Sequence, residues 1–523
     1  MADLQKFKEA IEAGYATKGE YIVLGTGIVN GEAVEGALIK APLKTFNRHG
    51  LIAGATGTGK TKTLQVIAEQ LSQQGVPVLL MDVKGDLSGI AKAGTSNSHI
   101  EERHAKIGLP WVAHNNPVEF LTLSHEKGAK LRATVSEFGP VLFSKILGLN
   151  DTQEGVVAII FKYCDDKQLP LLDLKDFKKV MNYITNEGKD EIQAEYGKVS
   201  TATTSTILRK IIELEQQGAE QFFGERSFEV DDLCRVDENG KGYLSIIRLT
   251  DIQDKPKLFS TFMLCLLAEV YATFPEEGDS GRPKLVIFID EAHLIFDEAS
   301  KALLDQIETI VKLIRSKGVG VFFCTQNPTD VPDSILAQLG MKVQHALRAF
   351  TAKDRKQIKL TAENYPLSDF YDTENQLTAL GMGEAFVTVL NEKGIPTPLA
   401  ATLLQAPRSR MDVLTAQEID EINNASFLVK KYNEVVDRDS AFEILTNKLK
   451  TAQQAPMPQP QAQQPTAPST RQPKQEEEQS TLSRGAEMVG DAVNSGVGKI
   501  IVRELTRGLL GVLGFTSTGR RRK

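Results

Sequence analysis

The sequence predicts an α/β fold in which a mostly parallel sheet is covered by helices on both faces. From residue 51 onwards, short apolar runs alternate with helical patterns, as in doubly wound sheets. A strand, a glycine-rich turn and a helix follow one another over 51–74, and a strand over 76–81 completes a βαβ unit. The 523 residues, 41% hydrophobic and 25% charged, have the composition of a globular protein with a large core.

The first 50 residues are expected to extend this sheet rather than to form a domain. Residues 3–13 have an amphipathic helical pattern. Two apolar stretches within 21–40 are separated by Asn30-Gly31, a dipeptide typical of hairpin turns. We therefore expect a helix and two strands at one edge of the sheet.

The nucleotide-binding core is assigned to residues 51–94 and 241–405. Its further strands are expected at 243–249, 285–289, 319–324, 341–347 and 383–390, and its helices at 61–74, 257–273 and 299–316. Between the two parts of the core, residues 95–240 are predicted to form a mainly helical insertion, with helices at 151–164, 173–185 and 200–217.

The C-terminal part is divided by its composition. Residues 406–450 are expected to be helical, and the Gln- and Pro-rich residues 451–480 to form a linker that buries no core. Within 481–523, a helical pattern over 483–515 precedes a basic end, Arg520 to Lys523. Two interpretations stay open: a solvated tail, or a helix that docks on a partner, a sister subunit or a membrane surface.

Composition excludes several classes of protein. The net charge of -7 gives no support to a general polyanion binder, although DNA motors bind through local basic surfaces. The four cysteines are scattered without a CxxC pair, so neither a disulfide framework nor a structural zinc site is expected. The N-terminus lacks a signal-peptide pattern, and no apolar run reaches the roughly 18 residues of a membrane span. A cytoplasmic protein is expected.

One motif carries a strong functional signal, the run Gly54-Ala55-Thr56-Gly57-Thr58-Gly59-Lys60-Thr61. It matches the phosphate-loop pattern, in which glycines turn backbone N–H groups toward one anion and the following helix adds its positive end. Lys60 is expected to bridge the terminal phosphates of ATP, and the Thr61 hydroxyl to bind Mg²⁺. A chance glycine-rich turn is the alternative, but the flanking strand and helix both favour the phosphate loop.

A second motif follows the apolar strand 285–289, where Asp290 and Glu291 are adjacent. Ligands of such sheets bind at the carboxyl ends of the strands. Asp290 is therefore expected to hold Mg²⁺ through water, and Glu291 to polarise the attacking water. An acidic helix cap would explain the pair alone, but not its occurrence together with a phosphate loop.

Other polar residues at predicted strand ends have two interpretations each. Gln326 either reaches the γ-phosphate or the water, or caps a strand in a turn. Asp82, in the run Asp82-Val-Lys84-Gly-Asp86, either supports the metal or the base, or belongs to a charged surface turn. Arg315 and Arg348 taken alone are surface residues that form salt bridges.

Together, GATGTGKT, the VKGD turn, IFIDEAH and the TQNP segment resemble the HerA/FtsK superfamily of ring-forming motor ATPases, over about residues 20–440. Within it, the chain is similar to the HerA-like C-terminal-domain family. The resemblance implies a RecA-like core and a homo-oligomeric ring, often a hexamer, with ATP sites between subunits and DNA or protein in the central channel. It also implies that Gln326 is a polar sensor, that Arg315 acts on the neighbouring subunit's ATP, and that Arg348 is a second functional arginine.

HerA helicases carry an N-terminal β-barrel that pairs with a nuclease, and the roughly 50 residues before the phosphate loop are too few for it. A nuclease partner is therefore not expected. The first hypothesis is ATP hydrolysis coupled to DNA translocation, as in a helicase. The alternatives are a nucleotide-switched scaffold and a protein-translocating ATPase, and DNA-stimulated ATP turnover would separate the first from the other two.

Overall fold

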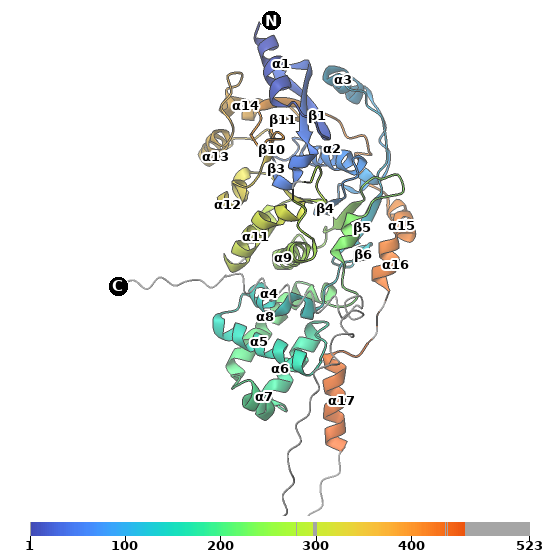
Figure 1. The fold of residues 1–523 in the computed structure, drawn as a ribbon, viewed down its shortest axis with the longest axis vertical. Coiled ribbons are helices and arrows are strands. Elements are labelled where there is room, and N and C mark those ends of the chain that lie inside the picture. Colours follow the sequence, from blue (N-terminus) through green and yellow to red (C-terminus); the bar gives the residue numbers. More distant parts are fainter. Residues whose placement is uncertain (1, 279, 297–300, 435, 437, 455–523) are drawn as a thin grey trace, which may run out of the picture.

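In a computed structural model, the chain folds around a single large sheet with a helical lobe at one end (Figure 1). The structure describes residues 2–278, 280–296, 301–434, 436 and 438–454. Within this part the sheet has 12 strands in the order β2-β1-β12-β11-β10-β3-β9-β8-β4-β7-β5-β6. The expected α/β class is confirmed.

Eight neighbouring strands, from β10 to β6, are parallel, whereas β11, β12, β1 and β2 are antiparallel to their neighbours. The parallel strands are β10 (Met341–His345), β3 (Gly50–Ala53), β9 (Val319–Thr325), β8 (Leu285–Ile289), β4 (Val78–Asp82), β7 (Leu244–Arg248), β5 (Val118–Thr122) and β6 (Ala129–Lys130). The antiparallel strands are β11 (Glu384–Thr388), β12 (Ala400–Leu404), β1 (Tyr21–Val29) and β2 (Glu32–Pro42).

The hairpin β1–β2 forms one edge of the sheet, as predicted. Asn30 and Gly31 have φ values of 54° and 79°, which are the left-handed conformations of a two-residue turn that matches the twist of its strands. The hairpin joins the parallel strands only through β12 and β11. Strands from the N-terminal region and from residues 384–404 therefore extend the sheet on the same side.

Helices cover both faces of the sheet, and the burial of β8 on both of its faces illustrates this arrangement. Its five residues are all buried, with Ile287 and Ile289 in one core and Val286 and Phe288 in the other. Successive side chains of a strand point to opposite faces, so a strand between two helical layers must be apolar throughout. The first core contains α9 (Pro256–Thr273) and α11 (Lys301–Ile314), and the second contains α1 (Ala2–Gly14) and α2 (Lys60–Gln73).

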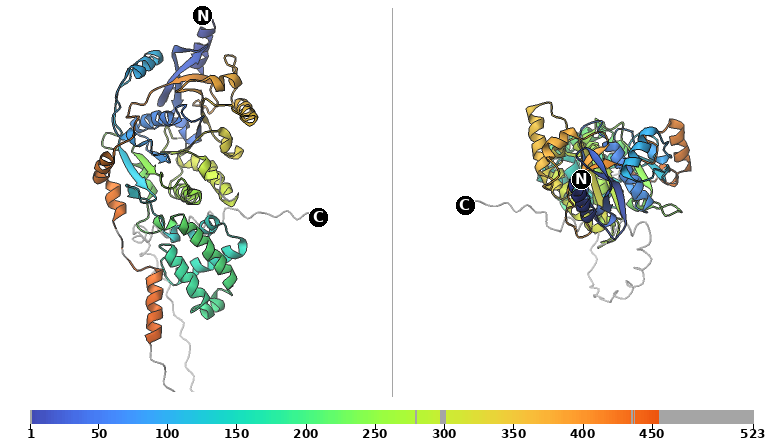
Figure 2. Two further views of the ribbon diagram at one scale, coloured as in Figure 1. Left: turned by 180° about the vertical axis from the view of Figure 1, so that it is seen from behind. Right: turned by 90° about the horizontal axis from the view of Figure 1, so that it is seen from above.

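Most of the other helices outside the lobe lie around the edges of the sheet, whereas α17 lies beside the lobe (Figures 1 and 2). They are α3 (Ser98–Ile107), α10 (His293–Phe296), α12 (Asp333–Leu336), α13 (Ala352–Glu363), α14 (Thr373–Ala379), α15 (Ala416–Ala425), α16 (Phe427–Asn433) and α17 (Ala441–Gln454). None of the helices in the described residues is both long enough and apolar enough to cross a membrane.

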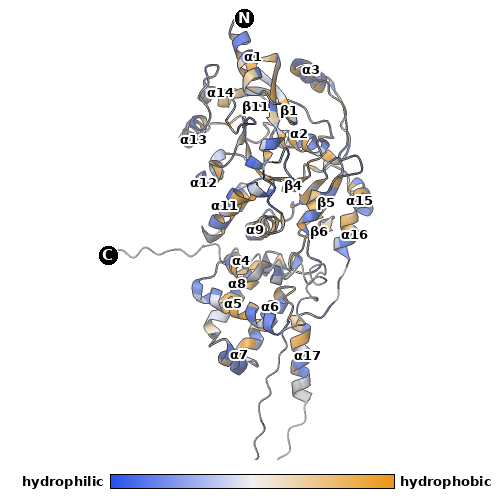
Figure 3. Ribbon diagram, viewed as in Figure 1, coloured by the Kyte–Doolittle hydropathy of each residue, from blue (hydrophilic) through white to orange (hydrophobic). Residues whose placement is uncertain are grey.

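The helical lobe consists of α4 (Val135–Leu147), α5 (Asp151–Asp166), α6 (Leu174–Thr185), α7 (Lys189–Glu195) and α8 (Thr201–Gln216). Its helices carry both hydrophobic and hydrophilic residues, as α5 and α6 illustrate in Figure 3. Asn150 and Asp173 cap α5 and α6 through side-chain oxygens that accept backbone N–H groups. α17 packs against α6, alongside the lobe (Figure 2).

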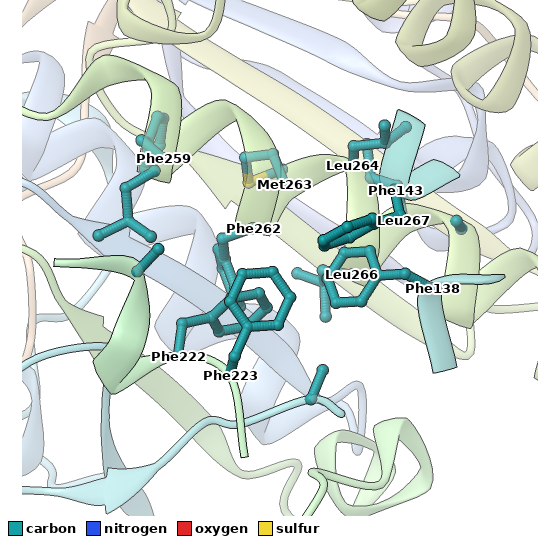
Figure 4. Close-up of a cluster of buried hydrophobic side chains, with 14 of the residues drawn as sticks. Phe138, Phe143, Phe222, Phe223, Phe259, Phe262, Met263, Leu264, Leu266 and Leu267 are labelled. Atoms are coloured by element: carbon teal, nitrogen blue, oxygen red, sulfur yellow. The ribbon is translucent and has the colours of Figure 1, made fainter. Parts of the chain in front are cut away.

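Phenylalanines attach the lobe to the sheet (Figure 4). The ring of Phe222, 2% exposed, contacts those of Phe138 on α4 and Phe262 on α9, with centroids 5.9 and 5.8 Å away. Edge-to-face pairs of this kind are worth about 0.5–1.5 kcal/mol beyond the area they bury. The lobe therefore shares one core with the face of the sheet that α9 covers.

Three regions differ from the expectation or fall outside it. Residues 95–240, expected to be mainly helical, also contribute β5 and β6 to the main sheet, because a short apolar run at the sheet edge extends the parallel ladder. β12 follows a proline-containing stretch and was not expected. The linker, the terminal helix and the basic end expected over 451–523 fall almost entirely outside the described residues.

Candidate active site

The glycine-rich turn lies between β3 and α2, and it is tied to both neighbouring strands. The N–H groups of Gly54 and Ala55 donate to the carbonyls of Thr325, at the end of β9, and Ala346, just after β10. Gly54 has a φ of 150°, and a β-carbon there would lie 2.5 Å from Cβ of His345. Only glycine fits this close approach. The strand order thus determines where the loop opens.

Lys60 begins α2, with its side chain folded back over the turn. Its Nζ donates to the carbonyl oxygens of Gly54 at 2.6 Å and Ala55 at 3.2 Å. Burial, and then the charge of Lys84, lower the pKa of Lys60. A buried cation surrounded by turn backbone is suited to receive a multiply charged anion, because that anion would replace the lost hydration.

Asp290 and Glu291 follow β8 at the same edge of the sheet. Burial, and then the charge of Glu291, raise the pKa of Asp290 to about 7. Asp290 Oδ2 is buried and has no hydrogen-bond partner within the described residues. Glu291 has a φ of 47°, a left-handed conformation that costs free energy in a residue other than glycine. Asp290 is thus desolvated and the backbone of Glu291 is strained, and both conditions are common in functional sites.

Lys84 is the partner of Glu291, and sequence reasoning missed this pairing. Its ammonium forms an ion pair with Glu291 Oε1, while His293 Nδ1 lies 3.3 Å from Oε2. Burial lowers the pKa of Lys84, but the contact with Glu291 and the charge of Asp290 outweigh burial and raise it overall. The lysine of the VKGD turn therefore positions the carboxylate that was predicted to polarise water.

Of the two interpretations left open for Asp82, the geometry favours the turn. Its Oδ1 accepts the N–H groups of Gly85 at 2.7 Å and Asp86 at 3.1 Å, and its Oδ2 accepts that of Leu87 at 3.2 Å. Burial raises the pKa of Asp82 to about 6. Asp82 thus stabilises the turn that presents Lys84, and its oxygens are already occupied.

Gln326 and Arg348 come together on one side of the glycine-rich turn. Both line a hollow of about 320 Å³ that also includes Ala55 and Thr56. Gln326 follows β9 and is exposed, while Asp330 accepts the Thr325 hydroxyl at 2.5 Å and so anchors the segment. The sheet brings these two predicted residues together because β9 and β10 flank β3.

Arg315 does not join this group. It precedes β9, so it lies at the amino ends of the parallel strands, opposite the turn. There it lines a hollow of about 380 Å³ together with Lys44, Arg48 and Lys312. Within one chain, Arg315 and the glycine-rich turn are therefore at opposite ends of the sheet.

A larger cavity, of about 600 Å³, opens on the other side of the turn. One end is lined by Lys60, Thr61 and Lys84. Its other end is lined by α3 and by residues 405–414, which we call the strap. The cavity-lining residues of these two segments, with the N-cap residue of α3, are Asn97, His99, Ile100, Arg103, Gln405, Ala406, Pro407 and Met411.

The strap is held against α2 by buried polar side chains that no sequence pattern indicated. Glu69 accepts the backbone N–H groups of Arg408 at 2.8 Å and Ser409 at 3.1 Å, and the Ser409 hydroxyl at 2.8 Å. Gln65 donates to the same hydroxyl at 2.9 Å. The helix that begins with Lys60 therefore also carries one wall of the cavity.

Arg103 and His345 complete the frame of the site. Arg103 of α3 donates to the carbonyls of Met382, Gly383 and Leu404 at 3.0–3.1 Å, which attaches α3 to the ends of β11 and β12. His345 Nε2 lies 2.9 Å from Thr63 Oγ1 on α2. Burial, and then Lys60, lower the pKa of His345 to about 4, so its ring is neutral.

The donor set suits a magnesium ion bound with a nucleotide. Among the described residues, no three His, Cys, Asp or Glu side chains gather into a group that could hold a metal alone. Magnesium in nucleotide sites needs only one or two protein ligands, because phosphates and water complete its octahedron. Thr61, which lines the cavity, and Asp290, whose Oδ2 is buried without a partner, fit this requirement.

Comparisons with known proteins find relatives of this chain. The DNA double-strand break repair helicase HerA of Saccharolobus solfataricus is 24% identical over 388 residues, 72% of this chain and 68% of that protein. HerA of Sulfolobus acidocaldarius is 22% identical over 388 residues, 73% and 70% of the two chains. Among solved structures, the unbound bacterial conjugative coupling protein TrwBdeltaN70 is 17% identical and covers 79% of this chain and 94% of its own, with a TM-score of 0.48.

A family model covers most of the chain. It is described as "Helicase HerA-like C-terminal" and matches residues 29–522. The match includes both motifs of the candidate site and every strand of the sheet from β2 onwards. The resemblance inferred from the motifs is confirmed, and the chain belongs to the Helicase HerA-like C-terminal family.

Proposed function

We propose that the chain is an ATP-hydrolysing motor of the HerA type that acts on DNA as a ring. One observation carries the proposal: the glycine-rich turn after β3 and the Asp290–Glu291 pair after β8 lie at the same edge of the sheet, separated only by β9, and Lys84 pairs with Glu291 there. The named relatives are DNA helicases, which supports DNA as the polymer. The cytoplasmic location expected from the sequence is part of the proposal.

ATP and Mg²⁺ are the cofactors. The turn 54–61 binds the phosphates through its backbone N–H groups and Lys60, and Thr61 and Asp290 hold Mg²⁺. Magnesium supplies charge neutralisation on the phosphate oxygens when it is bound. The cavity wall formed by Ile100, Ala406 and Pro407 is apolar and suits the nucleoside, since adenine binds between aliphatic side chains.

Glu291 orients and polarises the attacking water, and Gln326 and Arg348 contact the terminal phosphate from the neighbouring hollow. The pairing with Lys84 holds Glu291 out of reach of water until this ion pair opens. While the pair is closed, the Lys84 ammonium occupies Glu291 Oε1, so this oxygen cannot accept a proton from water. Breaking the pair is therefore the step that activates hydrolysis.

Arg315 completes the site of a neighbouring subunit. Within its own chain it lies at the amino ends of the strands, so it cannot act on its own phosphate loop. A head-to-tail ring, as in a hexamer, brings these two ends together. An arginine supplied in trans stabilises the charge that develops on the transferred phosphoryl group.

The first experiment measures ATP turnover with and without DNA, on protein whose oligomeric mass is known. Lys60→Ala should abolish turnover, and a fully active variant would refute the site assignment. DNA should raise the wild-type rate at low salt, where phosphate contacts are strongest. A rate indifferent to single- and double-stranded DNA would refute the DNA motor and favour a protein-translocating ATPase or a nucleotide-switched scaffold.

A mixing experiment tests the shared site. Arg315→Ala and Glu291→Gln subunits are each expected to be inactive in homogeneous rings. In mixed rings, some interfaces combine a wild-type Glu291 with a wild-type Arg315, so part of the activity should return. The matched control mixes Glu291→Gln with Lys60→Ala, two changes that fall on the same chain's half of the site, so no mixed interface is complete and no activity should return. Absence of rescue when Arg315→Ala is mixed with Glu291→Gln would contradict a trans-acting Arg315.

A further inference from the structure

α13 and the loop before it form an exposed basic surface, which we call the basic helix surface, residues 348–363. Its five cations are all exposed: Arg348, Lys353, Arg355, Lys356 and Lys359. Within the described part of the chain, the structure records no ion pair or hydrogen bond for these side chains. Of the two acids in this segment, Asp354 accepts the N–H groups of Phe350 and Thr351 and so caps the helix. The cations therefore stand out on a chain whose net charge is -7.

An aromatic side chain accompanies this charge. Phe350 is 82% exposed, although a phenylalanine normally avoids water, and it lies between Arg348 and the start of α13. Exposed aromatic rings beside cations are the usual elements of single-stranded nucleic-acid surfaces, where bases stack on the rings and phosphates meet the cations. A purely solvated helix face would explain the lysines but not the exposed ring.

The same helix contacts the candidate active site. Gln357 Nε2 donates to the hydroxyl of Thr329 at 3.3 Å, and Thr329 belongs to the segment that Gln326 begins. Phe350, Gln357 and Ile358 line the same hollow as Gln326 and Arg348. Ile358 is buried, and the exposed lysines lie on the other side of the helix. One face of α13 thus contacts the segment that begins at Gln326, and the other face is exposed and able to bind a polymer.

We propose that the four cations of α13 in the basic helix surface bind the sugar–phosphate backbone of single-stranded nucleic acid, with Phe350 stacking on a base, while Arg348 keeps its place in the ATP site, and that α13 transmits this binding to Gln326. This inference rests on the proposed function and names the surface through which the motor grips its polymer. The main alternative is a contact with a sister subunit. In the proposed ring, however, the hollow that carries Arg315 is lined by the further cations Lys44, Arg48 and Lys312 against one acid, Glu392, and an excess of positive charge on both surfaces disfavours their contact.

The test uses the triple variant Lys353→Gln/Lys356→Gln/Lys359→Gln in the full chain. Glutamine has nearly the same helix propensity as lysine, so α13 should remain intact. The matched control is Lys175→Gln/Lys189→Gln/Lys198→Gln, which neutralises three exposed lysines in the helical lobe. Affinity for a fluorescent poly(dT) oligonucleotide is measured from about 50 to 200 mM salt, together with the oligomeric mass and the thermal unfolding midpoint.

We expect the triple variant to bind poly(dT) at least about tenfold more weakly at 50 mM salt, because binding with fewer phosphate contacts releases fewer counterions. The slope of log K against log salt should become shallower by about 2, at about 0.7 for each of three cations. The control should retain wild-type binding. Wild-type affinity and slope in the triple variant would overturn this inference alone, whereas a wild type that binds no DNA would overturn the proposed function with it. Loss of the ring in the triple variant would show that α13 is a subunit interface.

A second variant tests the transmission. Gln357→Met keeps the length of the side chain but removes the hydrogen bond to Thr329. We expect poly(dT) affinity to stay within about twofold of wild type, while the ratio of DNA-stimulated to unstimulated ATP turnover falls. Phe350→Leu should weaken binding to poly(dT) more than binding to duplex DNA, whose bases are not free to stack. An unchanged stimulation ratio in Gln357→Met would contradict the proposed coupling.

Discussion

The contact between Glu69 and the strap makes the stability of the protein depend on pH in a calculable way. Burial raises the pKa of Glu69 from 4.5 to about 7, even though three donors surround its carboxylate. The folded chain therefore keeps this proton at pH values where the unfolded chain has lost it. Between pH 4.5 and 7 the folded state binds more protons, so the free energy of unfolding decreases as the pH rises. At about 1.36 kcal/mol per pKa unit, the full loss above pH 7 is about 3 kcal/mol.

Glu69→Gln isolates this effect, because glutamine resembles the protonated acid at every pH. The difference in unfolding free energy between variant and wild type should shift by about 2.5 kcal/mol in favour of the variant between pH 5 and pH 8, because part of the effect is already lost at pH 5. Urea unfolding followed by circular dichroism measures this difference. Glu102→Gln, at an exposed position on α3, is the control and should give no trend. A difference that stays constant with pH would refute the reasoning, since it would mean that the three donors compensate for burial.

Three further predictions concern the site and the lobe. The effects of Lys84→Met and Glu291→Gln on the free energy of thermal unfolding should not be additive, and their coupling free energy should be about 1 kcal/mol or more. The reason is that each change alone leaves a charge without its partner. Additive effects would mean that the ion pair contributes nothing to stability. Phe222→Ala should cost about 3–5 kcal/mol in urea unfolding, and a loss below about 1 kcal/mol would show that the lobe does not depend on this cluster. Gly54→Ala should abolish ATP binding and lower the melting temperature. The control is Gly148→Ala, whose added methyl group meets open space and which should lower the melting temperature less. Equal effects of the two substitutions would contradict the close approach of Gly54 to His345.

The elements that the sequence predicted well are those whose signal is local. β8 has the predicted bounds, because five consecutive apolar residues between polar ones indicate a fully buried strand. The hairpin at Asn30-Gly31 was equally clear from its turn dipeptide. The glycine-rich turn needed only its spacing and the flanking strand and helix.

The elements that were missed depend on partners distant in the sequence. The apolar run of β12 does not by itself distinguish a strand from a helical segment, and it becomes a strand because β1 and β11 pair with it on both sides. Lys84 meets Glu291 and Arg103 meets Gly383 only after the sheet has formed. The roles of Arg315 and Arg348 came from the family resemblance, and they stay predictions because no neighbouring subunit is part of the structure.

α2 explains how nucleotide binding could affect distant parts of the chain. At its first residue, Lys60 meets the phosphates of the proposed nucleotide, and near its middle Glu69 holds the strap. At its far end, the Ser72 hydroxyl donates to the carbonyl of Gly242, just before β7. A helix is stiff along its axis, so a displacement at Lys60 must also move the strap or strain these contacts. The strap leads directly into α15, whose Asp420 pairs with Lys127 beside β6. The phosphate site is thus connected through α2 and the strap to the β6 edge of the sheet. α13, which follows β10, adjoins the site on its other side.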